Sequence, residues 1–246
     1  MRRVLLIGAT SAIAQEVGRL YAERQAQVFL VGRTAEKLEA VAADLTVRGA
    51  KVVGTVCWDA RDWAQAADIV ARARHALGVL EVVLIAHGSL PRQEELWHHP
   101  ERSVEQFQLN ATSVVALLSA LVPVLQAQRR GTVGVISSVA GERGRARMAV
   151  YGAAKAAVTA FSAGVRGYLY PYGVKLITIK PGVVDTPMTA HLPKNFLFAS
   201  ARAVGRRIYR ALERGAPDIL YVPWWWRPVM ALARLVPERL FKRLRI

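Results

Sequence analysis

The 246-residue chain has almost no cysteine, no long uninterrupted apolar run, and about half as many acidic as basic residues. Its one cysteine, Cys57, cannot form an intrachain disulfide, which fits a reducing compartment and predicts a cytoplasmic protein. Because no stretch of 18 uncharged apolar residues is present, the sequence predicts no ordinary transmembrane helix. The apolar run at 4–8 is too short for the core of a signal peptide.

The shortage of acidic residues leaves a net charge of +16, from 34 Lys and Arg against 18 Asp and Glu. Such basic chains bind nucleic acids, anionic membranes or acidic ligands. Half of the excess lies from Arg202 onward, where eleven Lys and Arg residues accompany three Asp and Glu. No recognised nucleic-acid-binding motif accompanies this charge, so we expect no nucleic-acid partner.

Short apolar or β-branched runs alternate with helical segments along the chain. The runs are Val4–Gly8, Val28–Val31, Val52–Val56, Leu80–Ala86, Thr132–Ser137, Lys175–Lys180 and Ile219–Val222, and the expected helices are 12–24, 34–48, 61–76, 101–127, 149–171 and 199–213. This alternation predicts an α/β fold with a Rossmann-like, doubly wound, seven-stranded parallel sheet and helices on both faces. We expect one domain over 1–222 and a C-terminal amphipathic helical appendage over 223–246.

The turn after the first strand, at 8–14, is built of small residues but contains one glycine, Gly8. Such a turn lets backbone N–H groups approach a pyrophosphate at a helix N-terminus, although a tight turn without a ligand accounts for it equally well. No acidic residue lies between Val28 and Ala35, and Arg33 follows the second strand. An arginine there accommodates the 2′-phosphate of NADP, so we expect NADP(H) in preference to NAD(H). The alternative is a solvated arginine at a helix start.

Tyr151 and Lys155 lie four residues apart in a helical segment, which places both side chains on one helix face. A phenol has a reference pKa near ~10, too high for acid–base chemistry at neutral pH, and a neighbouring ammonium lowers that pKa. Ser138 precedes Tyr151 by 13 residues and ends an apolar strand, where its hydroxyl can hold a substrate carbonyl oxygen. These three residues predict a carbonyl-reducing or alcohol-oxidising site.

Together with Asp59, Gly88, Asn110 and the segment 181–186, these motifs resemble short-chain dehydrogenases/reductases over roughly residues 4–190. The resemblance implies that Tyr151 is the general acid in reduction and that Lys155 binds the nicotinamide ribose. It further implies that Ser138 orients the carbonyl and that Asn110 supports a water that relays protons to Lys155.

The same resemblance implies a nicotinamide-cofactor site, in which Asp59 meets the adenine and Thr186 the nicotinamide amide. The expected cofactor-binding residues are Gly8, Thr10, Ser11, Ala12, Ile13, Arg33, Asp59, Ala86, His87, Gly88, Tyr151, Lys155, Pro181, Gly182, Val184 and Thr186, with no metal. The sequence departs from the family pattern at two places. Ala12 and Ala14 stand where the family has the second and third glycines of the first turn, and Ile-Ala-His-Gly at 85–88 stands where the family has Asn-Asn-Ala-Gly. We interpret His87 as a cofactor-wall residue rather than a second acid.

The tail combines three consecutive tryptophans, at 224–226, with interleaved basic and apolar residues, and Pro237 divides it into two short helices. Basic amphipathic helices with tryptophan lie at membrane interfaces, so one expectation is peripheral attachment to the inner face of the cell membrane. The alternatives are a protein contact and a flap over the substrate cleft.

An apolar segment at 188–199 resembles the substrate lid of the family and indicates an apolar or lipid-linked substrate. The tail and the first turn resemble one branch, the decaprenylphosphoryl 2-keto-erythro-pentose reductases. We therefore expect a reductase of a lipid-linked keto sugar. A 3-oxoacyl-thioester or steroid-like carbonyl reductase is the enzymatic alternative, and a non-catalytic NADP-binding sensor or scaffold is the alternative of another class. The helical segments 101–127 and 149–171 resemble those that the family uses to form homodimers and homotetramers.

Overall fold

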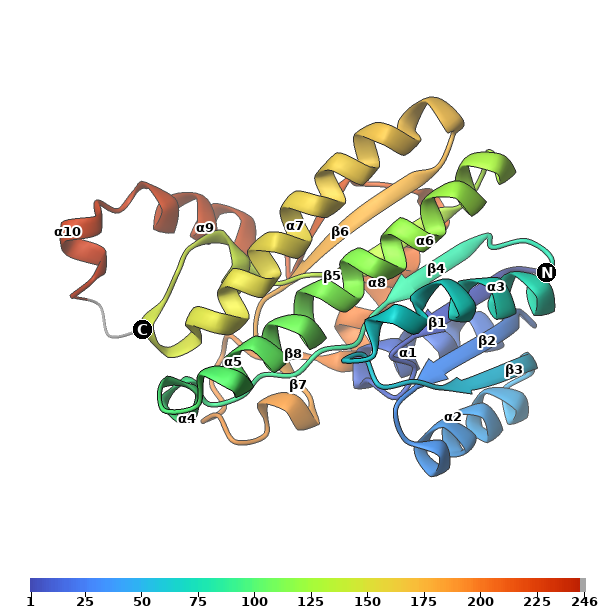
Figure 1. Ribbon diagram of the computed structural model, residues 1–246, viewed down its shortest axis with the longest axis horizontal. Coiled ribbons are helices and arrows are strands. Elements are labelled where there is room, and N and C mark those ends of the chain that lie inside the picture. Colours follow the sequence, from blue (N-terminus) through green and yellow to red (C-terminus); the bar gives the residue numbers. More distant parts are fainter. Residues whose placement is uncertain (244–246) are drawn as a thin grey trace.

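The computed structural model describes residues 1–243 and contains one seven-stranded parallel sheet in the order β3-β2-β1-β4-β5-β6-β9 (Figure 1). Its strands are β1 (Arg3–Ile7), β2 (Gln27–Gly32), β3 (Lys51–Cys57), β4 (Val82–Ile85), β5 (Thr132–Ile136), β6 (Lys175–Pro181) and β9 (Ile219–Val222). Successive strands cross over through helices, as parallel pairing requires. The predicted fold class is therefore confirmed, and each predicted run forms a strand.

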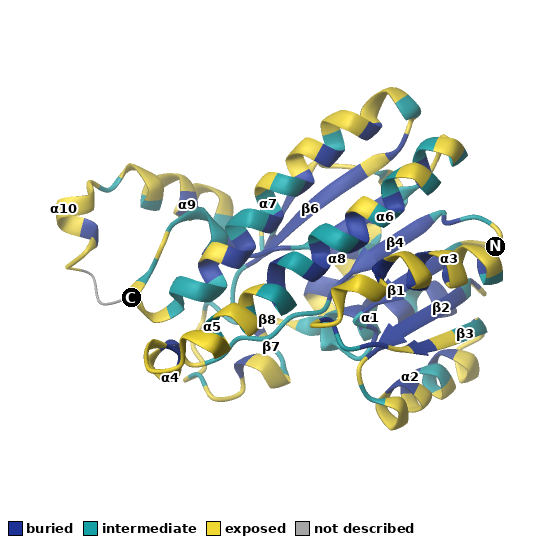
Figure 2. Ribbon diagram, in the orientation of Figure 1, coloured by how far each residue is buried: buried dark blue, intermediate teal, exposed yellow. Residues whose placement is uncertain are grey.

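Six longer helices cover the two faces of the sheet. They are α1 (Ala12–Ala22), α2 (Ala35–Val47), α3 (Ala66–Leu77), α6 (Ser113–Gln128), α7 (Ala149–Leu169) and α8 (Ala201–Arg214). In β1, Leu5 and Ile7 pack with α3, α6 and α7, whereas Val4 and Leu6 pack with α1, α2 and α8. Side chains alternate across a strand, so strands β1, β2, β4 and β6 each contribute to two apolar cores, and Figure 2 shows the sheet as the most buried layer.

The predicted helix over 101–127 is in fact two helices joined by a wider turn. Helix α5 (Pro100–Phe107) leads into a π-helical turn at Gln108–Thr112, and α6 continues from Ser113. A π turn adds a residue to the helical repeat and often marks a functional position. Here the extra residue turns Asn110 inward. The short helix α4 (Gln93–Trp97), which the sequence did not predict, precedes α5.

Two helical stretches, Pro100–Gln128 and Ala146–Tyr172, are long and apolar enough by composition to cross a membrane. The absence of a wholly uncharged run therefore did not exclude such helices. Their inner sides, on α6 and α7, pack against the sheet within the apolar core. This packing accounts for their apolar composition as core helices, and the length criterion is weak evidence for a span.

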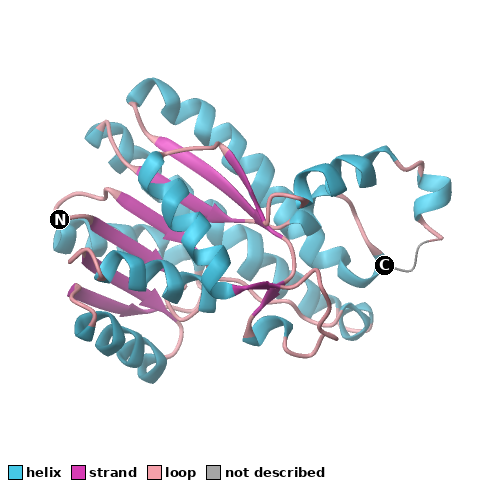
Figure 3. Cartoon of the chain, turned by 180° about the vertical axis from the view of Figure 1, so that it is seen from behind, coloured by secondary structure: helices cyan, strands magenta, loops and turns pink. Residues whose placement is uncertain are grey.

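Beyond β6, a two-stranded ribbon of β7 (Val184–Asp185) and β8 (Ala199–Ser200) encloses the apolar segment predicted as a lid. After β9 the chain forms α9 (Trp226–Leu235) and α10 (Glu238–Phe241), which project beside the sheet (Figures 1 and 3). The helices are separated at Val236 and Pro237. The prediction of two short helices divided by Pro237 is therefore confirmed.

Candidate active site

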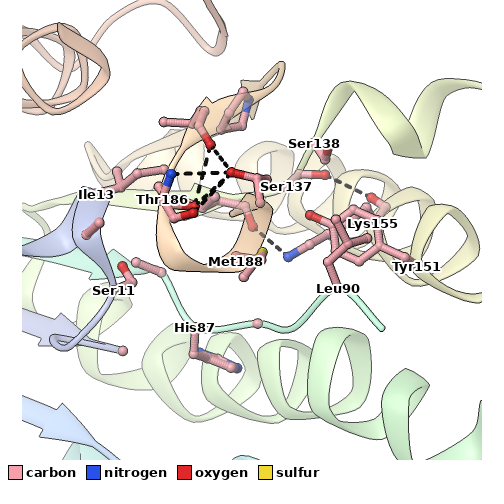
Figure 4. A pocket seen from close by; sticks show the side chains of 18 of the residues that line it. Ser11, Ile13, His87, Leu90, Ser137, Ser138, Tyr151, Lys155, Thr186 and Met188 are labelled. Carbon is pink, nitrogen blue, oxygen red and sulfur yellow. Dashed lines mark hydrogen bonds between the residues drawn. The ribbon is translucent and has the colours of Figure 1, made fainter. Parts of the chain in front are cut away.

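One cavity of about 450 Å³ lies across the carboxyl ends of the strands, where ligands bind in open α/β sheets. Every residue of the predicted cofactor-binding set lines it, from the turn after β1 to the segment after β6. Ser138 lines it as well, and Asn110 does not. Figure 4 places Ser138, Tyr151 and Lys155 near one another, with Thr186 and Met188 on the neighbouring loop.

The turn after β1 forms the phosphate end of this cavity. Gly8 has φ of +77°, and a Cβ there would lie 2.5 Å from the backbone nitrogen of His87, so the turn requires glycine. The Ser11 hydroxyl caps α1 by accepting a hydrogen bond from the Ala14 N–H at 3.1 Å. Helix α1 has no acidic residue in its first turn, and its dipole therefore favours an anion at this end. These features fit the pyrophosphate of a dinucleotide, although Ala12 replaces a family glycine.

Two further residues line the end of the cavity at which the family resemblance places the adenosine, called the adenosine end below. Arg33 is exposed at the rim, where its guanidinium is accessible to a ligand. The Asp59 carboxylate accepts hydrogen bonds from the Arg61 side chain at 2.6 Å and from the Arg61 backbone at 2.9 Å. Hydrogen bonding to Arg61 holds the pKa of Asp59 below its ordinary value. Asp59 is thus an ionised acceptor fixed in position beside the cavity.

Ser138 and Tyr151 meet at the end of β5. The Ser138 Oγ accepts a hydrogen bond from the Ala140 N–H at 3.1 Å, which leaves the hydroxyl hydrogen free to point at an oxygen in the cavity. Burial raises the pKa of Tyr151 to about 12, with the Ser138 hydroxyl and the Arg145 charge acting in the opposite direction. Tyr151 is therefore a neutral proton donor at physiological pH, the form that protonates a carbonyl oxygen.

Lys155 lies one helical turn after Tyr151 and is almost completely buried. Its Nζ donates a hydrogen bond to the Ile136 carbonyl at 3.1 Å and lies 5.7 Å from the centre of the Tyr151 ring. Burial lowers the pKa of Lys155 to about 8. The ammonium is thus held by the end of β5, on the side of the Tyr151 ring.

Asn110 lies behind the cavity wall rather than on it. Its Nδ2 donates to the carbonyls of Gln106 and Ser89 at 3.0 and 3.1 Å, and its Oδ1 accepts from the Ser89 N–H at 3.0 Å. A Cβ on Gly88 would lie 2.9 Å from that Oδ1 and 3.6 Å from the Nζ of Lys155. The structure therefore brings Asn110 beside Lys155, where its side chain holds the loop after β4; the water relay remains a prediction.

His87 lines the cavity as a neutral imidazole. Burial, aided by the charge of Lys155, lowers its pKa to about 3. Ser113 Oγ donates its hydrogen to the Leu109 carbonyl at 2.7 Å, so it accepts one from His87 Nε2 at 2.8 Å. This tautomer leaves Nδ1 without a hydrogen, and the described chain provides it no partner. A residue that stays neutral above pH 4 fits a wall position and not a second acid.

The part of the cavity beyond Ser138 and Tyr151, called the substrate end below, contains side chains that the sequence analysis did not single out. Leu90, Arg145, Met148 and Trp226 line the cavity beyond Ser138 and Tyr151, together with Met188 and Leu192 from the predicted lid. Trp226 reaches the cavity from the tail and lies against Gly182, where a Cβ would be 1.8 Å from the indole nitrogen. Trp224 is well exposed, so the three tryptophans do diverge. The three consecutive tryptophans marked the tail as unusual in the sequence, but they did not indicate which of the three rings faces the site.

The tail is fixed to the loop between Ser138 and Tyr151 by Arg143. The guanidinium donates to the carbonyls of Ala233 and Val236 at the end of α9, forms an ion pair with Glu238 at 3.0 Å, and lies 3.8 Å from the centre of the Phe241 ring. These contacts satisfy carbonyls that a helix end leaves unpaired. The structure thus places the tail against the substrate end of the cavity.

Glu142 makes a second, buried connection at the same place. Its carboxylate accepts hydrogen bonds from Lys180 at 3.0 Å and from the Tyr221 hydroxyl at 2.6 Å, and Arg234 of α9 lies 3.6 Å away. Both members of the Glu142–Lys180 pair are almost fully buried. Removing one partner of such a pair leaves an uncompensated buried charge, which makes this contact costly to break.

Comparison with known proteins agrees with this geometry. The short chain dehydrogenase family matches residues 2–196. The chain is a short-chain dehydrogenase/reductase. It is 32% identical over 241 residues to an uncharacterized oxidoreductase of Mycobacterium tuberculosis, covering 98% of this chain and 96% of that protein. It is 34% identical over 244 residues to an uncharacterized oxidoreductase of Streptomyces coelicolor, covering 99% and 96%.

Solved structures share the fold. A short chain dehydrogenase from Burkholderia cenocepacia, in complex with NADP, superposes with a TM-score of 0.82 at 23% identity over the full length of both chains. Levodione reductase superposes with a TM-score of 0.80 at 22% identity over 90% of this chain and 95% of that one. Because the chain belongs to this family, the protein is an oxidoreductase that uses a nicotinamide cofactor.

Proposed function

We propose that this enzyme reduces the ketone of a lipid-linked keto sugar, or of a similar apolar substrate, with NADPH. The observation that carries the proposal is the apolar end of the cavity, where Leu90, Met148, Met188, Leu192 and Trp226 surround the approach to Ser138 and Tyr151. Such a surface favours an alkyl or prenyl chain beside the carbonyl. The resemblance to decaprenylphosphoryl 2-keto-erythro-pentose reductases names the same substrate class.

The residues of the site have separate tasks in this reaction. Ser138 donates its free hydroxyl hydrogen to the substrate carbonyl oxygen and orients it. Tyr151 donates the proton that converts this oxygen to an alcohol, and Lys155 stabilises the tyrosinate that remains. NADPH, when bound, supplies the hydride. Lys155 is almost completely buried and Tyr151 is half-buried, which limits the access of bulk water to their polar atoms.

NADP(H) is the cofactor that the adenosine end favours. Arg33 lies at the rim of the cavity with its guanidinium exposed, and no acidic residue lies between Val28 and Ala35 to bind the ribose 2′-OH of NAD. A guanidinium binds a phosphate through paired hydrogen bonds. The Burkholderia cenocepacia structure, which contains NADP, supports the same assignment by analogy.

We further propose that the outer face of the tail lies on an anionic membrane surface. Trp224, Leu232, Leu235 and Leu240 are exposed there, and the basic residues Arg227, Arg239, Lys242 and Arg243 are exposed among them. Each basic residue near anionic lipid contributes about 1 kcal/mol. A substrate with a prenyl chain resides in that membrane, so the contact would bring the cavity to its substrate.

A homodimer or homotetramer is the assembly that we propose. Helices α6 and α7 run side by side on one face of the sheet (Figure 1), and Val104, Phe107, Tyr168 and Tyr170 are exposed on or beside these helices. Exposed large apolar and aromatic side chains on and beside these helices favour association with a second copy. Light scattering of the purified protein tests this assembly directly.

The test of the reaction follows NADPH oxidation in mild detergent with a polyprenyl-phosphoryl 2-keto-pentose and, separately, an acetoacetyl thioester. Tyr151→Phe removes the proton donor, and we expect at least a 10²-fold lower kcat. Tyr168→Phe, on an exposed tyrosine of the same helix, is the matched control. Turnover of the thioester alone would support the 3-oxoacyl alternative, and biological activity that survives Tyr151→Phe would favour a sensor.

A further inference from the structure

The loop that joins Ser138 to Tyr151 carries one arginine into the active-site cavity. This residue, Arg145, lies between two single-turn helices at Val139–Glu142 and Ala146–Met148. Its side chain lines the cavity together with Ser138 and Tyr151, and it is partly buried. Its charge acts on the tyrosine, since it is one of the influences that lower the Tyr151 pKa.

Within residues 1–243 the Arg145 guanidinium makes no hydrogen bond and no ion pair. The nearby acids are already engaged, because Glu142 is bound by Lys180 and Tyr221, and Glu238 by Arg143. Burial lowers the pKa of Arg145, which records the cost of holding this charge away from water. A partly buried guanidinium without a protein partner is suited to binding an anionic group that enters the cavity.

The cavity itself provides no such anion. Asp59 is the one acidic side chain among the described residues that line it, and Asp59 is paired with Arg61 at the adenosine end. The phosphates of a dinucleotide also belong to that end, at the turn after Gly8 and at Arg33. Arg145 lies instead with Met148 on the loop that leads to Tyr151, where the substrate enters.

We propose that Arg145 binds an anionic group that the substrate carries close to its reactive carbonyl, either a phosphoryl group or a carboxylate. A guanidinium matches both groups through paired, charge-assisted hydrogen bonds. This proposal deepens the proposed function and rests on it, because a phosphoryl keto sugar has its phosphate beside the ketone. An oxoacyl thioester has no charge at that position, so Arg145 would discriminate between the two classes.

The experiment compares two synthetic ketones that differ in charge. One is the octyl phosphodiester of hydroxyacetone, and the other is its neutral octyl ether, each assayed with NADPH. We expect Arg145→Met to lower kcat/KM for the phosphodiester by roughly 10- to 100-fold and to change that for the ether less than about threefold. Arg147→Met is the matched control, since Arg147 is an exposed arginine two residues away that does not line the cavity.

Equal losses for both ketones, or no loss for the phosphodiester, would overturn the role of Arg145. A third ketone, with a carboxymethyl group in place of the phosphodiester, identifies the anion. If Arg145→Met lowers kcat/KM for this ketone by a comparable factor, the subsite also binds carboxylates. If kcat/KM is unchanged, the subsite is limited to phosphoryl groups. If the wild type reduces an acetoacetyl thioester and neither ketone, the proposed function fails. Octyl phosphate then tests Arg145 separately, because it should inhibit the wild type at least about tenfold more strongly than Arg145→Met; equal inhibition would refute the subsite.

Discussion

Replacing Gly182 with alanine tests whether the tail is part of the active-site wall. Gly182 follows β6, and its N–H donates a hydrogen bond to the Val222 carbonyl at 3.0 Å, so its backbone cannot easily move. The added Cβ would lie 1.8, 2.2 and 2.5 Å from three atoms of the Trp226 indole. Carbon atoms in contact are about 3.5–4.0 Å apart, so the indole has to leave its position by more than about 1 Å.

The size of the effect follows from this overlap. Overpacking of a well-packed site costs about 1–3 kcal/mol. For a domain of this size each kcal/mol lowers Tm by about 2–4 °C, so we expect a decrease of about 2–12 °C. Reduction should also slow, because the displaced ring no longer closes the substrate end. The control is Gly167→Ala within α7, where an added Cβ meets no other atom. This variant should leave Tm unchanged or slightly higher.

A double-mutant cycle separates this clash from other effects of the methyl group. Trp226→Ala removes the indole, so the Gly182→Ala/Trp226→Ala protein should recover part of the lost stability, with a coupling energy of about 1–2 kcal/mol. Thermal unfolding gives the stability and initial rates of NADPH oxidation give the activity. Additive losses in the double variant would mean that Trp226 does not lie on Gly182, and the position of the tail would be wrong.

Three other predictions concern the cofactor, the proton donor and the tail. Arg33→Ala should lower kcat/KM for NADPH about 10-fold or more and leave that for NADH nearly unchanged, and an equal loss with both would remove Arg33 from the 2′-phosphate site. Because the lowered pKa of Lys155 is about 8, Lys155 is charged below that pH and neutral above it. Reduction should therefore decline as pH rises through about 8, while His87, whose pKa is about 3, adds no decline between pH 5 and 7. A rate that keeps rising to pH 10 would contradict the role of Lys155. Arg143→Met should free α9 and α10 and expose the chain after residue 222 to limited proteolysis, whereas unchanged protease resistance would show that these contacts are dispensable.

The fold was predictable from the sequence because its signals are local and repeated. Each strand is a short apolar run, and the run at Val82–Ile85 is apolar throughout, as a strand covered on both faces must be. The π turn at Gln108–Thr112 was not predictable in the same way. Its residues continue a helical pattern, and the extra residue is stabilised by the bonds that Asn110 forms with Ser89 on a distant loop.

The candidate site was predictable where a motif fixes the spacing. Ser138, Tyr151 and Lys155 belong to one continuous strand, loop and helix, so their sequence order already places them together. Trp226 and Arg145 belong to no such motif. Trp226 reaches the cavity through the packing of the tail, and Arg145 lines the cavity without a partner whereas the nearby Arg143 is bound to α9 and Glu238. Neither property is visible in the residues themselves.

In the structure, two of the alternatives for the tail are compatible with each other. From the sequence, a membrane contact and a flap over the substrate cleft were competing interpretations of residues 223–246. In the structure α9 and α10 have two different sides: Trp226 and Met230 face inward, while Leu232 and Leu235 face outward. The inner side forms the wall of the substrate end, and the outer side is free for a surface. One short segment can therefore serve both roles, and a variant that loosens Arg143 should impair turnover of a lipid-linked ketone more than turnover of a short, water-soluble one.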